Sequence, residues 1–167
     1  MLLRKILDTW KSISHEVKWT VPDATDYCRF YAPLEIDGIL EAGLVLKGGS
    51  YSALPDRHVS FELAIRNLRT GRDTSLSRVD WRDLKGGHSN KRRSCRGLIS
   101  RTAATHFHEF DLNYIAGEDR MKRQLPCARN IRENLDTFDE LRDFVGTHFR
   151  IKNMNGIPLP NWEYRLL

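Results

Sequence analysis

Apolar residues recur along the chain with two periods, one typical of helices and the other typical of strands. Between residues 2 and 19 they recur every three or four positions, which predicts an amphipathic N-terminal helix. The clearest period of two lies in 57–66, where Val59, Phe61, Leu63 and Ile65 alternate with polar side chains. This segment is therefore predicted to be a strand with one apolar face.

Four other segments are predicted to be strands: 26–36, 44–46, 74–81 and 106–114. The strands at 57–66 and 74–81 form an antiparallel hairpin around the polar connection 67–73. Short helices are expected at 118–124 and 127–134, and Thr137 with Glu140 forms a capping box that begins a C-terminal helix. We predict a single α+β domain over 1–167, with an N-terminal helix, an antiparallel sheet of about five strands, and C-terminal helices packed on one face.

The chain is basic, with a net charge of +5 and a pI of about 9.3 over 167 residues. This balance favours a polyanionic partner such as nucleic acid, although a basic surface also serves solubility. No apolar run reaches the roughly 20 residues that cross a membrane, and the first residues lack the apolar core of a signal peptide. A cytoplasmic protein with no membrane partner is expected.

Three cysteines stand far apart, at Cys28, Cys95 and Cys127, and no CxxC pair exists. A thiolate metal site is therefore not expected, and three free thiols in a reducing compartment are the simplest interpretation. Cys95 has basic neighbours that would lower the pKa of its thiol, so a nucleophilic role is the alternative.

A block of positive charge without any acidic residue lies between Asp83 and Glu109. Its six cations are Lys85, Lys91, Arg92, Arg93, Arg96 and Arg101. We call residues 85–101 the basic loop. An uncompensated block of one charge favours contact with phosphates, which arginine can bind through two parallel hydrogen bonds. The alternative is a loop that is only solvated.

Two histidines, His106 and His108, stand two apart in a predicted strand, so they share a face. They could act as a general acid and base, bind a metal if His88 or Asp80 supplied a third ligand, or be hydrogen-bonded core residues. Arg78 and Asp80 also share a face, as an expected ion pair. We expect no bound metal and no cofactor.

Several common enzyme signatures are absent from the sequence. It has no Walker loop, GxGxxG turn, GxSxG elbow, HExxH pair or EF-hand loop. Nucleotide-driven enzymes, Rossmann dehydrogenases and the common hydrolases are therefore not expected.

Three segments together resemble the core of the TumE-like toxins of bacterial toxin–antitoxin pairs. They read Arg57-His58-Val59-Ser60-Phe61-Glu62-Leu63, then Arg78-Val79-Asp80-Trp81, then Gly86-Gly87-His88-Ser89-Asn90. The segment 138–144 is similar to the closing helix of that family, whereas 91–101, the strand at 106–114 and the C-terminal tail have no counterpart there. The resemblance implies action on RNA and a cognate neutralising partner, and it carries over His58, Asp80 and His88 as site residues.

The function expected from these features is that of a toxin-like protein directed at nucleic acid, with the chemistry of a metal-independent ribonuclease. The acid–base candidates are His88, His106 and His108, with His58 and Asp80 added by the resemblance. The phosphate-binding candidates are Lys91, Arg92, Arg93, Arg96 and Arg101. Two alternatives stay open: a non-enzymatic defence or counter-defence module that docks on nucleic acid or a protein complex, and a metal-dependent hydrolase that uses the three histidines.

Overall fold

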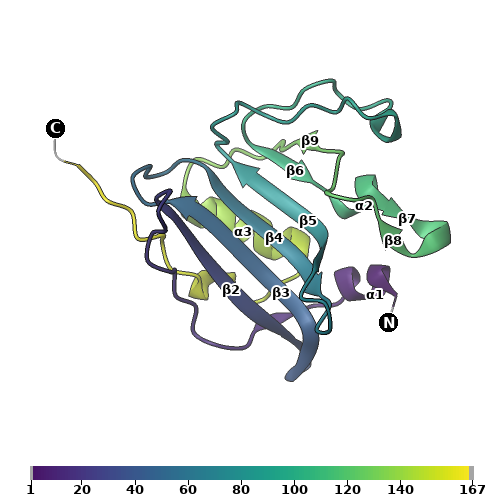
Figure 1. The fold of residues 1–167 in the computed structure, drawn as a ribbon, viewed down its shortest axis with the longest axis horizontal. Helices are drawn as coiled ribbons and strands as arrows, with labels where there is room; N and C mark the ends of the chain where they lie inside the picture. Colours follow the sequence, from purple (N-terminus) through teal and green to yellow (C-terminus); the bar gives the residue numbers. More distant parts are fainter. Residues whose placement is uncertain (1, 166–167) are drawn as a thin grey trace.

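The computed structural model describes residues 2–165, and its main element is a seven-stranded antiparallel sheet (Figure 1). The strand order is β1-β2-β3-β4-β5-β6-β9. These strands are β1 (Ser12–Ile13), β2 (Tyr27–Ile36), β3 (Ile39–Tyr51), β4 (Val59–Arg66), β5 (Asp73–Trp81), β6 (His106–His108) and β9 (Arg129–Asn130). The α+β class and the antiparallel sheet are thus confirmed.

All five predicted strands belong to this sheet, and the hairpin of β4 and β5 pairs as expected. The two unpredicted members, β1 and β9, have two residues each and form its edges. The strand predicted at 106–114 is shorter, because after β6 the chain turns into helix α2 (Phe110–Asn113). A second, two-stranded sheet follows, formed by β7 (Tyr114–Ile115) and β8 (Arg120–Met121).

One face of the main sheet is covered by the C-terminal helix α3 (Phe138–Phe149), whose predicted capping box is present. Phe138 of this helix packs on Phe61 with ring centroids 6.1 Å apart, and Phe144 packs on Phe107 at 5.6 Å. Figure 1 shows α3 behind β4 and β5, and the opposite face of the sheet turned toward the viewer. The helix thus closes the core on one side and leaves the other face of the sheet for polar side chains.

The predicted N-terminal helix at 2–19 is wrong in its length. Helix α1 (Leu3–Asp8) has only six residues, and Ile13, Val17 and Trp19 are buried from extended chain. These odd-numbered positions also fit a period of two, so the apolar pattern alone did not distinguish a helix from an extended chain. Lys11, a charged residue within the predicted helix, is fully buried, and its ammonium donates to the carbonyls of Leu7, Thr9 and Phe149.

The short helices predicted at 118–124 and 127–134 are also wrong. The chain there forms a 3-10 turn, η2 (Ala116–Glu118), followed by β8 and β9. Asp119, Gln124 and Leu125 adopt positive φ angles, which a right-handed helix does not accept. The C-terminal side carries one α-helix, α3, followed by the 3-10 turn η3 (Met154–Gly156).

The prediction of three free thiols is wrong, because Cys95 and Cys127 form a disulfide across 32 positions of sequence. Only Cys28 is free, and it is buried. Closing a loop of this length stabilises the fold by roughly 3–4 kcal/mol in the chain-entropy account. The bond also removes Cys95 as a nucleophile. Disulfides persist mainly in oxidising compartments, so this pair counts against the predicted cytoplasmic location, which stays a prediction.

Within residues 2–165, no helix combines the length and apolar character that crossing a membrane requires.

Candidate functional site

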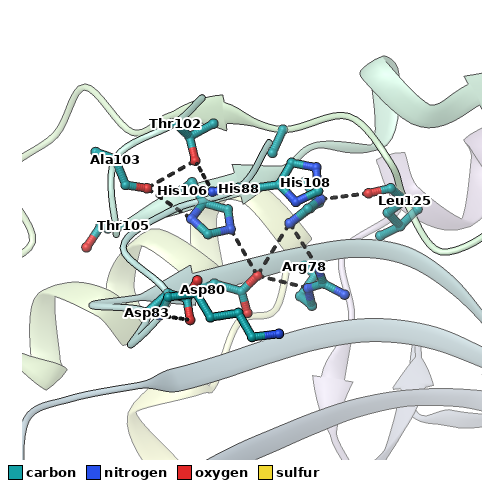
Figure 2. A network of polar contacts seen from close by, with 12 residues as sticks. Arg78, Asp80, Asp83, His88, Thr102, Ala103, Thr105, His106, His108 and Leu125 are labelled. Atoms are coloured by element: carbon teal, nitrogen blue, oxygen red, sulfur yellow. Dashed lines mark hydrogen bonds and ion pairs between the residues drawn. The ribbon is translucent and has the colours of Figure 1, made fainter. Parts of the chain in front are cut away.

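A polar cluster forms where β5 pairs with β6 on the sheet face opposite α3. The register places Asp80 beside His106 and Arg78 beside His108. Both histidines point toward Asp80 (Figure 2). Phe107, between them in sequence, packs on Phe144 of α3 instead. The prediction that His106 and His108 share a face is confirmed, and so is the ion pair of Arg78 with Asp80, at 2.9 Å.

A single oxygen of Asp80, Oδ2, is the centre of this cluster. It accepts a hydrogen bond from Arg78 Nε at 2.9 Å, and it lies 3.3 Å from His106 Nε2 and 3.4 Å from His108 Nε2. Burial alone would raise the pKa of Asp80, but the contact with His106 Nε2 and the charge of the Arg78 guanidinium outweigh it and hold that pKa well below its usual range. The carboxylate is therefore ionised at neutral pH.

His108 is fully buried, and both of its ring nitrogens are engaged. Nδ1 lies 2.7 Å from the Leu125 carbonyl, which only accepts, so Nδ1 carries the proton. Nε2 then accepts from Arg78 Nη2 at 2.9 Å. Burial, together with the positive charge of Arg78, lowers the pKa of His108 to about 4 against the opposing effect of Asp80. His108 is thus neutral at pH 7 and positions Arg78.

His106 is similarly enclosed, with only 2% of its side chain exposed. Its Nδ1 donates to the Ala103 carbonyl at 3.1 Å, which leaves Nε2 facing Asp80. The sequence made His106 and His108 the leading acid–base candidates. Both side chains are instead almost fully enclosed, and their Nε2 atoms face Asp80, with Arg78 as a further partner of His108.

A cavity of about 410 Å³ opens above this cluster. Its lining includes the three residues that the toxin resemblance carried over, His58, Asp80 and His88. The other lining residues are Tyr51, Arg78, Asp83, Leu84, Lys85, Gly87 and His106. We call this space the histidine cavity.

His58 and His88 are half-buried, and their ring nitrogens are arranged in opposite ways. His88 Nε2 donates to the Pro126 carbonyl at 2.7 Å, so the neutral ring has its lone pair on Nδ1. His58 Nδ1 lies 3.2 Å from both the Leu84 backbone nitrogen and Asp83 Oδ1, so Nε2 is the ring nitrogen that neither contact occupies. One ring is therefore suited to accept a proton and the other to donate one.

The basic loop lies at the top of Figure 1, and its residues Lys85, Gly87 and His88 line the histidine cavity. At its base His88 and Thr102 exchange hydrogen bonds, and Arg101 donates to the carbonyl of Lys85 at 2.8 Å. Gly87 permits this closure, since a Cβ there would lie 2.0 Å from the Thr102 carbonyl oxygen. The disulfide joins Cys95 in the loop to Cys127, close to the Pro126 carbonyl that holds His88.

The six cations of the basic loop are all exposed. Within residues 2–165 none of them forms an ion pair. The two acidic residues that flank the loop in sequence are engaged elsewhere, Asp83 with His58 at 3.2 Å and Glu109 with Arg129 at 2.6 Å. The loop therefore presents uncompensated positive charge next to the histidine cavity.

Asp80, His106 and His108 also form the one group in the described part of the chain with the spacing of metal ligands. One ligand atom from each lies within 4.8 Å of the others, and His88 is not a member. However, Arg78 donates to two of these atoms, Asp80 Oδ2 and His108 Nε2. Its guanidinium thus occupies the position that a bound cation would need.

Comparison with protein-family models, with curated proteins and with solved structures finds no match for this chain. The reading of the site consequently rests on its own geometry.

Replacing Arg78 with alanine should create a metal site. The substitution frees two ligand atoms and removes a positive charge that would repel a divalent ion by several kcal/mol at close range. We expect Arg78→Ala to bind Zn²⁺ at least about tenfold more tightly than the parent in isothermal titration calorimetry, whereas Arg78→Lys, which keeps the charge, should bind like the parent. Equal Zn²⁺ affinity in the parent and Arg78→Ala would show that Arg78 does not hold the cation position.

Proposed function

We propose that this protein cleaves RNA by metal-independent acid–base catalysis in the histidine cavity. One observation carries the proposal: His58, engaged through Nδ1, and His88, engaged through Nε2, line the same cavity as Arg78 and Lys85. Cleavage of RNA next to its 2′-hydroxyl needs a proton acceptor, a proton donor and positive charge for the phosphorane, and this cavity offers all three.

The proton steps follow from the two histidines. His88 Nδ1 takes the proton of the 2′-hydroxyl, and the 2′-oxygen forms a bond to phosphorus. The bond from phosphorus to the 5′-oxygen breaks, and that oxygen receives a proton from Nε2 of the imidazolium form of His58, whose Nδ1 faces the Asp83 carboxylate at 3.2 Å. The products are a 2′,3′-cyclic phosphate and a 5′-hydroxyl, and later proton exchange with water restores both histidines.

Arg78 and Lys85 stabilise the negative charge on the phosphorane. Arg78 is held by Asp80 and His108 in a fixed orientation, which avoids reorganisation during the reaction. Its side chain is 30% exposed, whereas those of His106 and His108 are almost fully enclosed, so Arg78 is the best placed of the three to meet a substrate. His106 and His108 are therefore proposed as positioning residues.

The basic loop supplies the affinity for the RNA backbone, because its cations have no acidic partners to displace. The resemblance to TumE-like toxins supports the same proposal, since the residues that it carried over all line the histidine cavity. A cognate neutralising protein, as in such pairs, belongs to the proposal as well.

Removing either cavity histidine should abolish most cleavage. We expect His58→Ala and His88→Ala each to lower the cleavage rate about a hundredfold or more, the usual contribution of one general acid or base. His15→Ala is the matched control, because His15 is exposed and lines neither the cavity nor its floor. The assay uses single-stranded RNA in EDTA, with mass spectrometry for the cyclic phosphate and a thermal melt of each variant.

Two results would contradict the enzymatic proposal. Intact RNA from pH 5 to pH 9 with a folded parent protein would leave a non-enzymatic binding module. Cleavage that persists in both histidine variants would show that His58 and His88 are not the acid and the base. Cleavage that stops in EDTA would show that the reaction needs a metal ion.

Reversing charge in the basic loop should weaken binding to RNA. We expect Arg92→Glu with Arg93→Glu to lower affinity steeply and to reduce the salt dependence, by a log–log slope of about 0.7 for each lost phosphate contact on a single strand. Arg69→Glu with Arg72→Glu changes the net charge equally, but at the opposite end of β5, where both residues are exposed. Affinity is measured by fluorescence anisotropy of labelled RNA. Equal losses of affinity in the two double variants would show that the basic loop contributes only through the net charge of the protein.

A further inference from the structure

A second cavity, of about 550 Å³, lies on the uncovered face of β2, β3 and β4. It is lined in part by Tyr27, Tyr31, Lys47, Ser60 and Glu62. The register pairs Ser60 with Asp80 and Glu62 with Arg78. Adjacent strands lie about 4.8 Å apart, so this cavity is one strand away from the polar cluster of Arg78 and Asp80.

Two tyrosines mark the boundary between the cavities. Tyr27 lines the second cavity and Tyr51 lines the histidine cavity, with ring centroids 4.8 Å apart. The Tyr27 ring extends across Gly49, where a Cβ would lie 1.8 Å from its hydroxyl oxygen. Glycine at position 49 therefore leaves room for the Tyr27 ring to lie across the sheet, near the polar cluster of Arg78 and Asp80.

The charges of the second cavity differ from those of the basic loop, because its cations have partners. Arg29 pairs with Asp23 at 2.8 Å, and Lys47 with Glu62 at 3.0 Å. Arg29 also stacks over the ring of Tyr27 at 4.6 Å. Arg66 repeats this arrangement on Tyr31, at 4.6 Å, while it pairs with Asp73. The cavity thus offers flat aromatic and guanidinium surfaces with little surplus charge.

We propose that the second cavity binds a nucleobase of single-stranded RNA, next to the phosphate that the histidine cavity cleaves. This inference rests on the proposed function and names its substrate class. Aromatic rings bind bases by stacking whatever their identity, and Lys47, Ser60 and Glu62 offer donors and an acceptor to a base edge. The phosphate backbone of the same RNA molecule continues from there to the unpaired cations of the basic loop.

Single-stranded RNA follows from the shape of this surface. A base in a duplex is stacked on its neighbours and paired along its edge, so its faces are not available to Tyr27 and Tyr31. A strand that enters the second cavity must expose its bases. The proposed enzyme is therefore selective for unpaired RNA.

Oligonucleotide binding tests this subsite apart from cleavage. The probe is a short single-stranded 2′-O-methyl oligoribonucleotide containing 2-aminopurine, which lacks the attacking hydroxyl and loses fluorescence when its base stacks. We expect Tyr27→Ala and Tyr31→Ala each to weaken binding roughly 5- to 100-fold, the loss of one base–aromatic stack, and to restore the fluorescence. Tyr27→Phe should behave like the parent, and so should Tyr164→Ala, which removes an exposed tyrosine that lines neither cavity.

The outcomes separate this inference from the proposed function. Loss of binding only in the variant carrying Arg92→Glu and Arg93→Glu, with both tyrosine variants like the parent, would overturn the base subsite and leave the proposed function standing. Equal binding of a duplex of the same composition, with the same dependence on the tyrosines, would overturn the single-strand assignment. A parent protein that binds neither probe would overturn both proposals.

Discussion

The buried carboxylate of Asp80 is the constraint on which the site depends. A charge in this position is costly unless it is paired and hydrogen-bonded, and Arg78 provides the compensating charge from the same strand. Arg78 in turn needs a neutral acceptor for its second nitrogen, and His108 supplies it because the Leu125 carbonyl fixes its proton on Nδ1. The charge of Asp80, the position of Arg78 and the tautomer of His108 therefore depend on one another.

The segments outside the sheet serve to hold this network and the cavity above it. Carbonyls of Ala103, Leu125 and Pro126 orient His106, His108 and His88 in turn. None of these carbonyls belongs to a regular strand or helix. The Cys95–Cys127 disulfide stabilises the same region by joining the basic loop to the chain beside Pro126. The disulfide thus makes these loops rigid enough to hold the imidazole rings in fixed orientations.

Local patterns predicted much of the fold, because strand period and capping chemistry depend on neighbours in sequence. The alternation in 57–66, the shared face of His106 and His108, and the capping box at Thr137 all needed only near neighbours. Three features depend on contacts between residues distant in sequence, so local patterns could not predict them. They are the short length of α1, the Cys95–Cys127 disulfide, and the burial of His106 and His108. For the same reason the sequence could not show that His58 and His88 line the cavity together with His106, whereas His108 is not among its lining residues.

The central claim is that a neutral, Nδ1-protonated His108 holds Arg78 against Asp80. Long-range ¹H–¹⁵N NMR spectra of the imidazole rings, recorded against pH, measure this directly. The account predicts that His108 carries its proton on Nδ1 at pH 7, with Nε2 as an acceptor, and that it titrates near pH 4. A His108 ring that titrates near the ordinary value of about 6.5, or that carries its neutral-state proton on Nε2, would contradict it.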